Sequence, residues 1–333
     1  MNQRCADDSR LGVLDGWRGV SILLVLGAHL LPLGPKPWQL NYVAGAMGMA
    51  IFFTLSGFLI TNFLLKHDSI VDFLIRRFFR IVPLAWLYMA IALFLMKSNA
   101  EFCFANFLFY ANWPPMWLDK ANGHLWSLCV EVQFYVGIAM LVAILRRQWL
   151  FLILPICIAV TMYRVANGVH MAINTYYRVD EILAGSVLAL IYNYRMGDAP
   201  ARILARLWQL PLLFLLASSC HPDSGFLNYF RPYLAAGFVG ATLFNSKTRI
   251  ARAMDNRVLL YIATISYALY VVHPLLADTW LGSGEGIVKY AKRPLLFGAV
   301  FLSAHISTFH YEMRWIAFGK RLCTRWNDRL RAV

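Results

Sequence analysis

Apolar runs long enough to cross a bilayer follow one another along most of the chain, with short polar links between them. A helix rises about 1.5 Å per residue, so roughly 20 apolar residues cover a hydrocarbon core of about 30 Å. About ten runs predict transmembrane helices: residues 14–33, 42–65, 81–96, 125–145, 149–165, 179–194, 207–220, 229–245, 259–280 and 294–312. The apolar segment 102–110 is too short to cross and predicts an interfacial or re-entrant piece.

Positive charge clusters at alternate ends of these runs. The chain holds 31 Lys and Arg residues against 17 Asp and Glu residues. With the N-terminus in the cytoplasm, most of the basic residues fall on the cytoplasmic side, as the positive-inside rule requires. Ten spans return the chain to the cytoplasm, where a basic tail at 313–333 follows the last span. Because the charge does not form one basic face, we do not expect nucleic-acid binding.

The composition is that of an all-α, polytopic integral membrane protein. Hydrophobic residues make up 60% of the chain, and no long hydrophilic block remains for a separate soluble module. We therefore predict a single membrane domain over 1–333, with its core at about 11–312. The polar start of the chain is not followed by a small-residue cleavage site, so we expect the first run to remain as a span. The six cysteines form no CxxC pair, which favours free, buried thiols over disulfides or a metal site.

The first span carries three ionisable residues, Asp15, Arg18 and His29. Arg18 and His29 are 11 positions apart, about three helical turns, so both lie on one stripe roughly 16 Å apart along the axis. Asp15 precedes Arg18 by three positions and can pair with its guanidinium. Ionisable groups within the hydrocarbon are costly and mark function, and a neutral imidazole can act as a general base. The alternative is a histidine that only bonds a neighbouring helix.

The segment RRFFRIVP, residues 76–83, supplies a second candidate site at the cytoplasmic start of the third span. Arg77 and Arg80 are three positions apart and share a helical face, where their guanidinium groups, with Arg76 beside them, can bind phosphate oxygens. A cytosolic polyanion such as a coenzyme A thioester suits this placement. The alternative is that the arginines only fix the orientation of the span. We expect a loop before them and the span to begin near Ile81.

The segment HLWSLCVEVQFY, residues 124–135, opens the fourth span at the outer face. Glu131 lies about two turns into this apolar helix, where a carboxyl group needs a partner or must stay protonated. His124 and Ser127 precede it by helical spacings and share its face. The carboxyl group can orient the imidazole of His29 or act as an acid; the alternative is a buried carboxyl that serves only packing.

Weaker signals follow at three positions. Asp180 and Glu181 start the sixth span directly after Arg178, which favours an ion pair at the membrane rim. His273, in SYALYVVHP, is expected to bond a nearby backbone carbonyl. Gly57, in LSGFLI, predicts a close approach between helices.

Six motifs in this chain resemble those of the membrane-bound acyltransferase-3 family, which O-acylates sugars, polysaccharides and lipids. They occur in the family's order over about residues 11–312: LDGWRG with His29, FFTLSGFLIT, RRFFRIVP, HLWSLCVEVQFY, YYRVDEILAG and SYALYVVHP. The resemblance implies ten transmembrane helices and an acyl-CoA donor, usually acetyl-CoA, on the cytoplasmic side, with no metal. We expect the protein in a bacterial inner membrane.

The resemblance also implies roles for individual residues. Arg18 and His29 fit the family's arginine–ten residues–histidine motif, whose histidine is implicated in acyl transfer. Arg77 and Arg80 fit its R-x-x-R motif, which is linked to donor binding. Glu131 stands alone where the family often has two adjacent glutamates.

These residues favour transfer of an acyl group, most often acetyl, from cytosolic acyl-CoA to a hydroxyl of a glycan or lipid-linked saccharide. Membrane lipids are the other expected partner. No esterase-like domain follows the last predicted span, so we expect the membrane domain to complete the transfer. The rival hypothesis is a transporter or flippase of an anionic or saccharide-bearing substrate that uses the same residues. A catalytically silent relative that acts as a binding partner is the third hypothesis.

Overall fold

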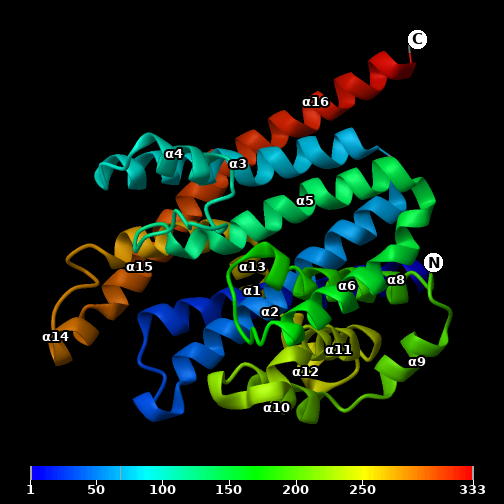
Figure 1. Cartoon of the computed structure of the whole chain (residues 1–333), viewed down its shortest axis with the longest axis horizontal. Helices are drawn as coiled ribbons and strands as arrows, with labels where there is room; N and C mark the ends of the chain where they lie inside the picture. Colours follow the sequence, from blue (N-terminus) through cyan, green and yellow to red (C-terminus); the bar gives the residue numbers. More distant parts are fainter. Residues whose placement is uncertain (1, 68, 332–333) are drawn as a thin grey trace. The chain divides into compact units, whose positions relative to one another are not determined.

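The computed structural model describes residues 2–67 and 69–331, and all regular secondary structure in these residues is helical (Figure 1). The last two residues of the predicted basic tail, 332–333, lie outside the described residues. The chain forms two compact units, each assembled from three stretches of sequence. The first contains Met1–Asn62, Leu150–Ala172 and Tyr176–Ser266, and the second contains Phe63–Trp149, Ile173–Thr175 and Tyr267–Val333.

The described helices confirm a multi-span membrane protein. Six stretches are long and apolar enough to cross a bilayer: Gly12–Leu30, Lys36–Lys66, Ile70–Leu95, Gly123–Leu145, Trp149–Ala166 and Arg257–Ala277. A seventh candidate is the pair Ala199–Arg206 and Gln209–Ser219, which is bent by 91° where a straight span over 207–220 was expected. The predicted spans 179–194 and 229–245 form helices of 13 and 14 residues, about 20 Å long, which is shorter than a hydrocarbon core. The predicted span 294–312 forms a 14-residue helix that continues into a π-helical turn.

The first unit is a bundle of helices around one apolar core. Its helices are α1 (Asn2–Leu30), most of α2 (Leu40–Lys66) and α6 (Trp149–Ala166), α7 (Thr175–Arg178), α8 (Asp180–Tyr192), α9 (Ala199–Arg206), α10 (Gln209–Ser219), α11 (Arg231–Phe244), α12 (Arg249–Met254) and the first half of α13 (Arg257–Ala277). Trp17 joins α1 to α11: its indole N–H donates to Thr242 Oγ1 at 2.9 Å. Its ring also meets Phe238 edge-on, with the ring centres 4.8 Å apart.

Helices α2 and α8 touch through their backbones, as the LSGFLI motif predicts. A Cβ on Gly57 would lie 1.8 Å from the carbonyl oxygen of Ile182, and a Cβ on Gly185 would lie 2.0 Å from that of Thr54. Only glycine permits backbones to approach so closely. The prediction of close helix approach at Gly57 is therefore confirmed.

The second unit is built on the pairing of α3 with the C-terminal helix. Its helices are α3 (Ile70–Leu95), α4 (Ala100–Phe107), α5 (Trp126–Leu145), the second half of α13, α14 (Gly286–Ala291), α15 (Arg293–Ile306), a π-helical turn (Ser307–Glu312) and α16 (Met313–Arg331). Helix α16, red in Figure 1, lies along α3 and packs extensively on it. Phe79 lies over Gly319 and stacks on Trp315.

The basic segment after the last predicted span forms a helix, α16, which packs on α3. One sequence-based expectation for this unit was wrong. The third helix begins at Ile70 and not near Ile81, because the Ser69 side chain caps it by accepting a hydrogen bond from the Asp72 N–H at 3.2 Å. The short segment near 102–110 is the eight-residue helix α4, as its length predicts.

We predict that Gly57→Ala destabilises the protein, because the added methyl group would lie 1.8 Å from a backbone oxygen of α8. Overpacking of this kind costs about 1–3 kcal/mol or more. The measurement is the melting temperature of the protein in detergent micelles. The matched control is Gly237→Ala on α11, where an added Cβ meets no atom within 4 Å. The control should hold or raise the melting temperature, since alanine favours a helix over glycine by about 1 kcal/mol; equal melting of both variants would contradict the close contact.

Candidate functional site

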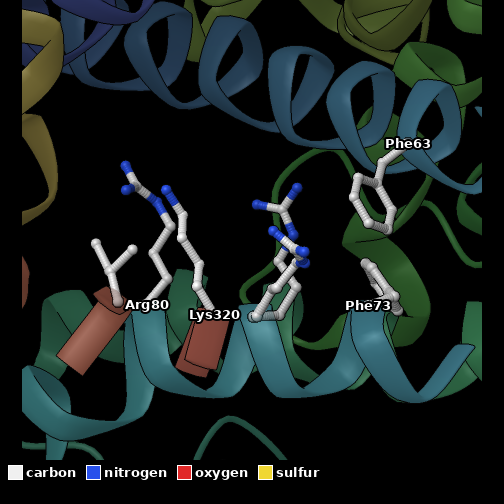
Figure 2. Close-up of a pocket in the computed structure, with 7 residues that line it drawn as sticks. Phe63, Phe73, Arg80 and Lys320 are labelled. Carbon is white, nitrogen blue, oxygen red and sulfur yellow. The ribbon is translucent and has the colours of Figure 1, made fainter. Parts of the chain in front are cut away.

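A pocket of about 150 Å³ in the second unit is lined by four cationic side chains and no carboxylate among the described residues. Three of the cations, Arg76, Arg77 and Arg80, come from α3, and the fourth, Lys320, comes from α16. The remaining lining residues are apolar: Phe63, Phe73 and Ile316. Figure 2 shows Phe63 and Phe73 at one end of the pocket and Arg80 beside Lys320 at the other. The pocket therefore carries a concentrated positive charge next to two aromatic rings.

Helix α3 places its arginines in the pocket because it starts early. With Ile70 as its first residue, Arg76, Arg77 and Arg80 all lie within the helix and not in a preceding loop. Spacings of three and four residues put them on neighbouring positions of the helix surface. The sequence-based grouping of these three arginines around one pocket is therefore found in the structure, although the loop expected before them is helical.

Glu131 connects to this pocket through Tyr135. The Tyr135 hydroxyl donates a hydrogen bond to Glu131 Oε1 one turn earlier on α5. The Arg77 guanidinium carbon lies 5.7 Å from the centre of the Tyr135 ring and 6.0 Å from that of Phe73. Cation–π contacts at these distances hold Arg77 over the two rings. Glu131 itself is only 7% exposed.

Sequence reasoning missed Lys320, which α16 brings into the pocket. Two contacts dock this part of α16 on α3: Asn327 Nδ2 donates to Asp72 Oδ2 at 2.8 Å, and the Cys323 thiol lies 3.8 Å from the Asp72 carbonyl oxygen. Burial and the nearby Asp72 carboxylate raise the pKa of the Cys323 thiol, so it stays neutral at the interface. The only sequence signal for Lys320 was its place in a basic tail.

An apolar groove of about 360 Å³ lies on the other flank of α3, between α3 and α5. Its walls include Phe78 and Val136, both exposed, and Arg77 lines it as well as the basic pocket. Arg77 is thus the side chain shared by the charged and the apolar hollow.

Arg18 and His29 lie in the first unit, on α1. Arg18 Nη1 is 3.3 Å from Asp15 Oδ1, so the expected pair is present, half-exposed at both partners. His29 lies in the last turn of α1, beside Leu30, and its side chain is exposed. Arg18 and His29 are 11 positions apart on this helix, roughly 16 Å along the axis.

The structure gathers His124 and Ser127 with residues of α13 in the second unit. His124 precedes α5 in a short 3₁₀ turn, Gly123–Leu125, and its ring centre lies 5.6 Å from that of His273. Tyr270 links the two elements, because its hydroxyl donates to the His124 carbonyl and lies 2.6 Å from Ser127 Oγ. His273 Nδ1 lies 2.8 Å from the Tyr270 carbonyl, which confirms the expected carbonyl bond.

Asp180 and Glu181 belong to a buried network of charges in the first unit. The expected ion pair with Arg178 is present, because Arg178 lies 3.3 Å from Glu181. Two further arginines join it: Arg164 donates to Asp180 at 2.6 Å and Arg231 donates to Glu181 at 2.6 Å. All five side chains are at most 2% exposed, so the pair is buried by tertiary packing where an exposed rim pair was expected. The cluster connects α6, α7, α8 and α11.

Comparison with known proteins finds one matching family model and several similar proteins. A family model described as "Acyltransferase domain" matches residues 11–309. A Staphylococcus aureus (strain COL) protein named "Putative O-acetyltransferase" is 27% identical over 309 residues, covering 78% of this chain and 49% of its own. The peptidoglycan O-acetyltransferase OatA of Listeria monocytogenes is 26% identical over 317 residues, covering 78% of this chain and 48% of its own. The chain therefore spans about half the length of these relatives. No solved structure gives a significant match.

We predict that Arg231→Met destabilises the first unit by about 3–5 kcal/mol, because it removes one of the two cations that neutralise the buried Glu181. Loss of a structural partner should lower the melting temperature in detergent micelles. Arg252→Met, at an exposed position of α12, is the matched control and should melt like the wild type. If both variants melt like the wild type, the network does not hold these helices together.

Proposed function

The chain belongs to the acyltransferase family whose model matches its residues 11–309, and from this premise we propose that it is a membrane O-acetyltransferase. The donor is a cytosolic acyl-CoA, in the first place acetyl-CoA. The acceptor is a hydroxyl of a glycan or of a lipid-linked saccharide. OatA, one of the relatives, is named for O-acetylation of peptidoglycan, which supports a polysaccharide acceptor.

The basic pocket is the observation that carries this proposal. Arg76, Arg77, Arg80 and Lys320 surround it without a neutralising carboxylate among its described lining residues. Four cations gathered around one hollow favour a polyanion, and guanidinium groups match phosphate oxygens in geometry and charge. Coenzyme A supplies such phosphates, and the donor therefore docks here with its phosphate groups at the cations.

His29 is the proposed general base or acyl carrier, and Arg18 assists it from the same helix. A neutral imidazole can take the proton of an acceptor hydroxyl as the oxygen attacks the thioester carbon, with the CoA thiolate as leaving group. The exposed position of His29 in the last turn of α1 supports access for a bulky acceptor. Glu131, held by Tyr135, tunes the protonation of the site.

The proposed topology has ten spans with both termini in the cytoplasm of a bacterial cell and the domain in the inner membrane. The distribution of basic residues supports this orientation. It places the arginine end of α3 on the cytoplasmic side, where acyl-CoA is present. It places the His29 end of α1 on the opposite side, where surface glycans are assembled.

We predict that His29→Ala abolishes transfer of radiolabelled acetyl from acetyl-CoA to glycan in purified membranes. Loss of a general base lowers the rate by about 10²–10⁴-fold. The control is His310→Ala, which replaces another exposed histidine and should retain activity. A transporter would label no acceptor in the wild type, so absence of labelled glycan there would overturn the enzymatic proposal.

We predict that Arg80→Ala raises the KM for acetyl-CoA by about tenfold, since one charge-assisted phosphate contact contributes about 1.5–3 kcal/mol. The kcat should change little, because Arg80 binds the phosphates and not the reacting thioester. Steady-state kinetics at several salt concentrations measure both constants. A fall in kcat with an unchanged KM would show that Arg80 does not act in donor binding.

A further inference from the structure

The basic pocket has two chemically different ends. At one end the rings of Phe63 and Phe73 lie with centres 6.1 Å apart, and the Arg77 guanidinium packs near Phe73. At the other end Figure 2 shows the charged groups of Arg80 and Lys320 pointing the same way, side by side. A ligand that fills the pocket must therefore offer a flat, stackable group and, a short distance away, a concentrated negative charge.

The end formed by Arg80 and Lys320 suits a phosphate monoester. A monoester carries about two negative charges on one phosphorus near neutral pH, so two converging cations match it. Arg80 offers a planar fork of donors, and Lys320 offers a compact point charge. Arg77, in contrast, is held by ring contacts with Phe73 and Tyr135 and suits the more diffuse charge of a diphosphate.

The aromatic end suits a nucleobase. Bases stack on aromatic side chains with a gain of about 1–3 kcal/mol each. Phe63 packs against the rings of His67 and Phe73, but it is only half-buried and lines the pocket, so part of its ring is accessible to a ligand. A base at Phe63 and a phosphate monoester at Arg80 and Lys320 are the two groups that a ribose 3′-phosphate nucleotide carries close together.

We propose that Lys320 and Arg80 together bind the ribose 3′-phosphate of coenzyme A, while the adenine ring stacks at Phe63. This inference rests on the proposed function and adds a specificity: the pocket distinguishes CoA from dephospho-CoA, which lacks only that phosphate. Helix α16 thereby completes the donor site, since it carries Lys320 and is docked on α3 through Asn327 and Asp72.

The experiment measures the Kd of CoA and of dephospho-CoA by calorimetry on the full-length protein in phosphatidylcholine nanodiscs. Lys320→Met keeps most of the side-chain length and removes the charge; because Lys320 is exposed, the variant should fold. The Kd of CoA should rise by about tenfold in this variant. The Kd of dephospho-CoA should stay within about twofold of the wild-type value, because its complex lacks the contact.

Three further variants sharpen the result. Lys320→Arg keeps the charge and should bind CoA nearly as well as the wild type. Arg325→Met removes a cation from an exposed position on the same helix, outside the described lining of the pocket, and should change neither Kd. Phe63→Leu should weaken both ligands to the same extent, because both contain adenine.

The outcomes separate this inference from the function on which it rests. Equal weakening of CoA and dephospho-CoA by Lys320→Met, or no weakening of either, overturns the 3′-phosphate assignment while CoA binding by the wild type still supports the donor site. If the wild type binds neither ligand, the proposed donor itself is wrong. If Lys320→Met instead reduces co-purification of phosphatidylglycerol and leaves the CoA Kd unchanged, Lys320 serves a lipid phosphate and the inference fails.

Discussion

The neutralisation of arginine in an apolar chain is the constraint on which this protein depends. A buried charge is tolerated only where an opposite charge and hydrogen bonds replace the water that it has lost. In the first unit, Arg164, Arg178 and Arg231 meet this requirement through Asp180 and Glu181. Because these residues come from α6, α7, α8 and α11, satisfying the charges also fixes how these helices pack. The close glycine contact between α2 and α8 then attaches α2 to the same assembly.

In the second unit, the arginines of α3 are more exposed and line a pocket. Arg76 is exposed and Arg77 and Arg80 are half-buried, and the described lining of their pocket offers no carboxylate. The buried Glu312 carboxyl interacts electrostatically with Arg80 from outside this lining. Water or an anionic ligand can supply the rest of the compensation. This difference separates arginines that hold a fold together from arginines that can bind a substrate, although both groups occur at the ends of apolar helices. Burial and the presence of acidic partners distinguish them, and residue type alone does not.

The sequence was sufficient for features that depend on local spacing. Hydropathy predicted six long helices that the structure contains, and the three-residue spacing of Arg77 and Arg80 predicted that they share one helical face, which lines a pocket in the structure. It was insufficient where distant segments meet. Asp180 was assigned to a rim pair because Arg178 is its neighbour in sequence, whereas its partner Arg164 comes from another helix. Lys320 was missed for the same reason: no periodicity relates the C-terminal helix to α3, and only their packing brings it to the pocket.

The cost of moving charge into hydrocarbon also shapes the proposed reaction. The phosphates of coenzyme A cannot enter the apolar interior without a large penalty, whereas an acetyl group is neutral and small. In the proposed site, a cluster of cations retains the phosphates and the acid–base group lies elsewhere. Only the neutral, thioester-bearing part of the donor then has to enter the apolar interior. Arg18 and His29 sit about three turns apart on α1, so one helix can carry a cation towards the donor side and an imidazole towards the acceptor side. On this view the strong positive charge of the α3 pocket is a requirement of the chemistry, because it keeps the nucleotide where water and cations can stabilise it.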